Sequence, residues 1–132
     1  MYEGNEIVPN ELREYIGVRQ FEGEPYRRWF MNDYFDLIVW ENGLNEPIGL
    51  QLCYDIQYHE RALTFKNNSY SHNKIDTGED TPTANRSPVL VVDGIFEAGS
   101  VLKRFAEESK NIDEKIRNYV LETIQNYMKL QH

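Results

Sequence analysis

The stretch IGLQLCYD (48–55) decides the fold, because apolar and polar side chains alternate along it. Ile48, Leu50 and Leu52 share one parity, whereas Gln51 and Cys53 share the other. Successive side chains of a strand point to opposite faces of its sheet, so this pattern predicts a strand with one apolar face. We expect that face to be buried against other elements.

Further strand-like runs lie on both sides of this stretch. They are YIGVRQF (15–21), YRRWFM (26–31), YFDLIVW (34–40), RALTF (61–65) and SYSHNKI (69–75). Asn32-Asp33 and Asn67-Asn68 separate neighbouring runs, and such residues suit tight turns. Sequential strands joined by short turns favour an antiparallel meander. We therefore expect about five to six strands within about residues 15–76.

The pattern changes after this region. Residues 76–88 are rich in Thr, Asp, Gly and Pro, which predicts a surface loop over 77–88, and PVLVVDG (88–94) indicates a short strand or extended segment. Apolar residues then recur at helical spacing over about 96–130, with Asn111 as the expected N-cap of the second helix. The chain, 1–132, is predicted to form one α+β domain with both C-terminal helices packed on one face of the sheet.

Composition narrows the classes of partner and compartment. The 132 residues carry a net charge of −8, which disfavours nucleic acid and anionic membranes. We see no signal peptide and no apolar run of membrane-spanning length, so the cytoplasm is the expected compartment. One cysteine, Cys53, excludes an internal disulfide and a Cys-rich zinc site.

The alternation also predicts which side chains share a face. Leu63, Phe65 and Ile75 are expected to point toward the helices with Leu50 and Leu52. The opposite face is expected to carry Asp36, Ile38, Trp40, Gln51, Cys53, Asp55, Thr64, Tyr70, His72, Lys74 and Asp76.

Aromatic and polar groups together are typical of a small-ligand groove or a protein contact. We therefore predict a non-enzymatic ligand-binding or protein-interaction module, which could also be a homodimer. The expected binding residues are Asp36, Trp40, Gln51, Asp55, Arg61, Tyr70 and His72.

The alternative is a small enzyme with His72 as acid or base beside Asp36, Asp55 or Asp76, with or without a divalent metal. His72 and Asp76 would lie about 13 Å apart along an extended strand. The sequence contains no Gly-x-Ser-x-Gly elbow and no phosphate-binding loop. We expect no cofactor and no resident metal, and the residues assign no catalytic group.

Arg27 and Arg28 occupy opposite faces of their predicted strand, where an arginine could bind an anion or pack on an aromatic ring. The one that points inward needs a carboxylate partner, and Asp33 and Asp36 are close in the sequence.

Several motifs carry a family resemblance. RRWF (27–30), DYFDLIVW (33–40) and QLCYD (51–55) resemble those of a family of small uncharacterised bacterial proteins. The resemblance extends from about Arg19 to the helices. It implies a bacterial, cytoplasmic protein, and no activity is established for that family.

Overall fold

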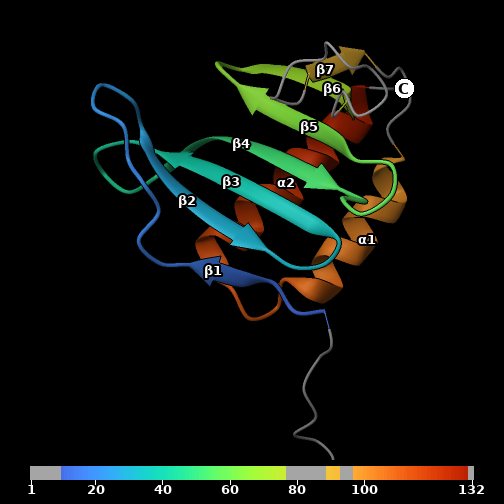
Figure 1. Cartoon of the computed structure of the whole chain (residues 1–132), viewed down its shortest axis with the longest axis horizontal. Helices are drawn as coiled ribbons and strands as arrows, with labels where there is room; N and C mark the ends of the chain where they lie inside the picture. The colour runs from blue at the N-terminus through green and yellow to red at the C-terminus, as the bar shows by residue number, and fades with distance from the viewer. Residues whose placement is uncertain (1–9, 77–88, 93–96, 131–132) are drawn as a thin grey trace, which may run out of the picture.

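The computed structural model, which describes residues 10–76, 89–92 and 97–130, shows an antiparallel sheet with two helices on one side. Its described strands pair in chain order as β1 (Arg13–Tyr15), β2 (Tyr26–Met31), β3 (Phe35–Glu41), β4 (Pro47–Tyr54), β5 (Arg61–Lys66), β6 (Ser69–Asp76) and β7 (Val89–Val92). Helices α1 (Ala98–Glu108) and α2 (Glu114–Leu130) lie behind the sheet in Figure 1. The predicted α+β class and meander are confirmed.

One strand differs from the prediction. The strand expected over 15–21 is the three-residue β1, and Gly17 and Gly23 adopt positive φ in the connection that follows it. Left-handed backbone of this kind breaks an extended run. At the other edge, β7 pairs with β6 and lies within the short strand or extended segment predicted over 88–94, so the described sheet has seven strands. The predicted loop 77–88 lies outside the described residues.

The core forms where the paired, inward-pointing residues of neighbouring strands contact the helices. Leu37 pairs with Leu52 and Leu52 pairs with Leu63, and all three are fully buried. Fully buried helix residues include Phe105, whose ring centroid lies 5.4 Å from that of Phe35. The inward assignment of these strand residues is confirmed.

Ile48 departs from the predicted alternation and is 44% exposed. Trp40 pairs with Gly49, but Glu41 pairs with Pro47, so the register shifts between them. A bulge leaves one residue without a cross-strand partner, and here Ile48 occupies that position.

The start of α2 also differs from the prediction. Asp113, rather than Asn111, caps the helix, because its Oδ1 accepts a hydrogen bond from the Lys115 backbone N–H at 2.9 Å. Asn111 instead donates from Nδ2 to the carbonyl of Leu12 at 2.6 Å, which ties the N-terminal segment to the helix connection. No helix among the described residues has the length and apolar character needed to cross a membrane.

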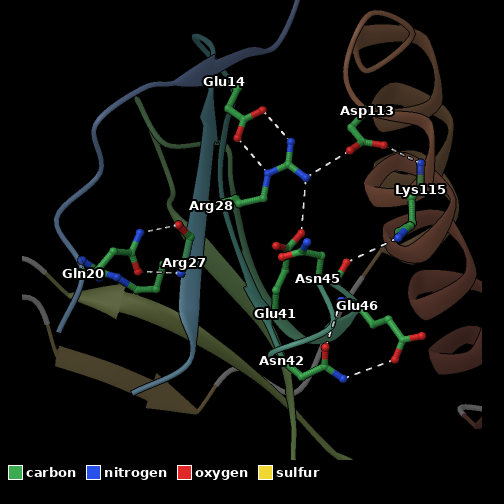
Figure 2. A network of polar contacts seen from close by, with 10 residues as sticks. All are labelled: Glu14, Gln20, Arg27, Arg28, Glu41, Asn42, Asn45, Glu46, Asp113 and Lys115. Carbon is green, nitrogen blue, oxygen red and sulfur yellow. Dashed lines mark hydrogen bonds and ion pairs between the residues drawn. The ribbon is translucent and has the colours of Figure 1, made fainter. Parts of the chain in front are cut away.

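Arg28 joins β1, β2, β3 and the start of α2 (Figure 2). Its guanidinium donates two hydrogen bonds to Glu14, at 2.8 and 2.7 Å, and one each to Glu41 at 3.3 Å and Asp113 at 3.1 Å. The hydrogen bond to Glu14 is the main cause that raises the pKa of Arg28, and Arg28 in turn lowers the pKa of Asp113. The inward arginine therefore has three carboxylate partners, and they are not the expected Asp33 or Asp36.

Candidate functional site

The sheet face opposite the helices carries three cross-strand rows of side chains, and we call it the open face. The rows are Arg27, Trp40, Gly49 and Lys66; Trp29, Ile38, Gln51 and Thr64; and Met31, Asp36, Cys53 and Ala62. Three of the predicted binding residues, Asp36, Trp40 and Gln51, lie in these rows on the neighbouring strands β3 and β4. The open face is therefore the predicted mixed surface in its central part.

Trp29 is one residue of this face that the sequence interpretation omitted. Its indole Nε1–H donates a hydrogen bond to Asp36 Oδ1 at 2.5 Å, and its ring centroid lies 5.0 Å from that of Tyr15. Burial raises the pKa of Asp36, and the hydrogen bond from Trp29 partly offsets this effect. The alternation along the strand could have placed Trp29 on this face, because Arg28 and Phe30 point inward and the residue between them must point outward.

A groove of about 210 Å³ opens beside this pair. It is lined by Val18, Arg19, Arg27, Trp29, Asp36 and Ile38. The connection between β1 and β2 forms one wall, because Gln20 bonds both the backbone N–H and the carbonyl of Arg27, at 2.8 and 2.9 Å (Figure 2). Arg27 also donates to the carbonyl of Arg19 at 2.6 Å. The groove thus has apolar walls with charged groups at its margin.

One end of the open face is acidic. Glu60, just before β5, lies near Asp36 and Cys53, and burial followed by the charge of Asp36 raises its pKa. Burial, followed by the charges of Asp36 and Glu60, also raises the pKa of the Cys53 thiol, which therefore stays protonated. Within the described residues, no cationic side chain lies within 4.0 Å of either carboxylate. The negative charges of these two acids therefore lie close enough to interact.

The other end of the open face is basic. Lys66 Nζ lies 4.7 Å from the ring centroid of Trp40, and Arg27 belongs to the same row. Gly49 separates these side chains in the sheet. A Cβ at Gly49 would lie 2.9 Å from the carbonyl oxygen of Phe65 and 3.3 Å from the Trp40 ring, so glycine lets the indole lie close to the sheet.

Tyr70 and His72 lie on the helix-covered face, so their predicted place on the open face is wrong. Tyr70 donates to the carbonyl of Thr123 in α2 at 3.3 Å. His72 is 7% exposed, and its Nε2 lies 2.6 Å from the hydroxyl of Tyr54.

The cause is the register of the β5–β6 hairpin. Its two-residue turn pairs Lys66 with Ser69 and hence Leu63 with His72, which puts even residues of β6 beside odd residues of β5. For the same reason Ile75 lies on the open face and not with Leu63, as was expected.

Asp55 and Arg61 occupy a third place, at the ends of β4 and β5. With Tyr34, Tyr54, Glu97, Ser100 and Val101 they line a cavity of about 270 Å³ near the start of α1. The side chain of Asp76 lies outside the described part of the structure. The described residues contain no group of three or more metal-ligating side chains. The predicted site residues therefore divide among three places, and Asp36 and His72 lie on opposite sides of the sheet.

We expect Asp36→Asn to stabilise the fold at pH 7, since an amide oxygen still accepts the Trp29 N–H without a buried charge. Because the pKa of Asp36 is higher in the folded than in the unfolded state, ionisation of Asp36 lowers the stability of the fold at pH values above the folded pKa. This destabilisation disappears as the pH falls below the unfolded pKa of about 3.9. The gain should therefore shrink on acidification. Urea unfolding at several pH values measures it, with exposed Asp33→Asn as the charge-matched control. Equal effects of both variants at all pH values would contradict the assignment.

Comparisons with protein-family models, curated proteins and solved structures find no match to this chain.

Proposed function

We propose that the protein is a non-enzymatic protein-interaction module and that the open face is its binding surface. The groove between the 18–21 segment and β2–β3 is the observation that carries this proposal. Trp29 and Ile38 supply apolar contact, while Arg19 and Arg27 supply charge at the rim. Tryptophan and arginine are enriched among the residues that dominate protein–protein contacts.

The size of the groove favours a protein partner over a small molecule. About 210 Å³ is below the 300–1,000 Å³ typical of small-ligand sites. The three rows extend well beyond it, over four strands. An apolar side chain of a partner fits the groove, and the remaining rows provide a broad contact around it.

The enzymatic alternative receives less support from this geometry. The sheet separates Asp36 from His72, and Asp55 lies at the strand ends, so one substrate atom cannot reach all three. The proposed compartment is the cytoplasm, where reducing conditions keep the Cys53 thiol free.

Anilinonaphthalene sulfonate (ANS), an aromatic anion, tests whether the groove accepts an apolar group. The chain has two tryptophans, so a Trp40→Phe background leaves Trp29 as the sole indole reporter. We expect saturable energy transfer from Trp29 to ANS. The protein is kept at about 1 µM, because a protein–protein contact of small area is dissociated at that concentration and the open face is then accessible.

In the same background, Ile38→Glu should abolish this signal. The control Leu44→Glu replaces an apolar residue that is 76% exposed on the β3–β4 turn, and it should bind ANS unchanged. Circular dichroism checks that both variants are folded. Absence of saturable binding, or equal binding by both variants, would refute the groove as a binding site.

A further inference from the structure

The charges of the open face are divided between its two ends. On β5, Glu60 immediately precedes the first residue and Lys66 is the last, so they lie about 20 Å apart along the strand. Asp36 shares the acidic end with Glu60, and Arg27 shares the basic end with Lys66. Apolar Trp29 and Ile38 lie between the ends in the middle row. Over β2–β5 the face therefore has an acidic end, a middle row with Trp29 and Ile38, and a basic end, and Arg13 of β1 extends the row of Asp36 at the sheet edge.

We infer that the partner of the open face is a second copy of this chain, bound face to face about a two-fold axis that crosses the strands. This inference rests on the proposed function, because it names the partner of the same surface. Such an axis reverses strand direction, so the basic end of each copy lies over the acidic end of the other. Lys66 then lies over Glu60 of the second copy twice, as the symmetry of an isologous contact requires.

The charge distribution selects this axis over the alternative. A two-fold axis parallel to the strands would keep strand direction, so the acidic end of each copy would lie over the acidic end of the other and the basic end over the basic end, and like charges in contact cost free energy. The crossing axis instead brings Lys66 to Glu60, which has no cation within 4.0 Å among the described residues. With Lys66 over Glu60 the axis is level with Leu63, so the middle row of each copy lies over the row of Met31 and Ala62 in the other, and Trp29 contacts Met31.

The area of the face sets the expected strength of the dimer. Four strands spaced about 4.8 Å apart and six residues of about 3.3 Å each give roughly 380 Å² of projected area per copy. Standard stable interfaces bury about 800 Å² of accessible surface per partner, so this contact belongs among the smaller, transient ones. We expect reversible association in the upper micromolar range.

Charge exchange on β5 tests the axis directly. Sedimentation equilibrium should be measured from about 1 to 500 µM protein, a range over which a dimer with a small interface goes from dissociated to associated. The average molecular mass of the wild type should rise from 15.6 kDa toward twice that value. Lys66→Glu alone and Glu60→Lys alone should each weaken self-association at least tenfold. An equimolar mixture of the two variants should associate, because both Glu–Lys contacts are restored between unlike copies. The double variant should also self-associate.

Lys103→Glu on exposed α1, away from the open face, is the charge-matched control and should behave as wild type. The inference is overturned if wild type stays monomeric, if either single variant associates like wild type, or if the mixture fails to associate. ANS binding at about 1 µM distinguishes the two proposals, because a small interface is dissociated there. If the protein stays monomeric but binds ANS, only the inferred dimer is overturned. If it stays monomeric and does not bind ANS, the dimer and the proposed binding surface are both overturned.

Discussion

Leu52→Ala is expected to lower the free energy of unfolding by about 2–5 kcal/mol. Leu52 is fully buried between Leu37 and Leu63, on the face that both helices cover. Truncation removes apolar contacts and leaves a cavity that the packed sheet fills only in part. Urea unfolding followed by circular dichroism measures the change.

Ile48→Ala is the matched control on the same strand. Ile48 is 44% exposed at the bulge, so its loss should cost less than about 1 kcal/mol. Comparable losses for the two variants would mean that the register shift between Trp40 and Glu41 does not exist in solution. A small loss for Leu52→Ala would instead place the core on the other face.

Arg28→Met is expected to lower the free energy of unfolding by about 2–4 kcal/mol. Breaking a buried ion pair from one side costs about 3–5 kcal/mol, and partial solvent exposure of Arg28 and Glu14 reduces that figure. Most of the loss arises at Glu41, whose side chain is 5% exposed and whose described cationic partner is Arg28. The remaining carboxylate would stay buried without a counter-charge.

The same variant should change the acid dependence of stability. Arg28 holds the pKa of Asp113 below its usual value, so ionised Asp113 stabilises the fold above a pH of about 4. That stabilisation is lost as the pH falls through the folded pKa, and Arg28→Met should weaken this dependence, because the backbone N–H and the charge of Lys115 still lower the pKa of Asp113. Arg104→Met, which breaks one exposed pair with Glu108, is the control and should cost about 1 kcal/mol or less. Equal losses for the two arginines would contradict the central role of Arg28.

Parity along a single strand predicted part of the open face. Asp36 and Trp40 alternate with the buried Leu37 and Val39, and Gln51 lies between Leu50 and Leu52. This local rule needs no information about other strands, because a strand directs successive side chains to opposite faces. The same rule places Trp29 outward, although its hydrogen bond to Asp36 depends on the pairing of β2 with β3.

Partners that are distant along the chain depended on the tertiary structure. Arg28 bonds Glu14, Glu41 and Asp113, from three different elements, whereas proximity in the sequence indicated Asp33 or Asp36. An inward cation pairs with the carboxylates that packing brings to the same face of the sheet. Asp36 cannot be its partner, because the row that contains Asp36 lies on the open face. Sequence distance carries little information about such contacts.

The sequence by itself determined the strands, the two helices and the alternation within each strand, because these follow from side-chain period and local backbone preference. Only the tertiary structure decided how the faces of neighbouring strands match. Asn67 and Asn68 both take positive φ in a two-residue turn, and this geometry pairs Leu63 with His72. His72 is thereby buried beside Tyr54 instead of lying on the open face. Register acts in this way because shifting a pairing by one residue moves every side chain of a strand to the opposite face.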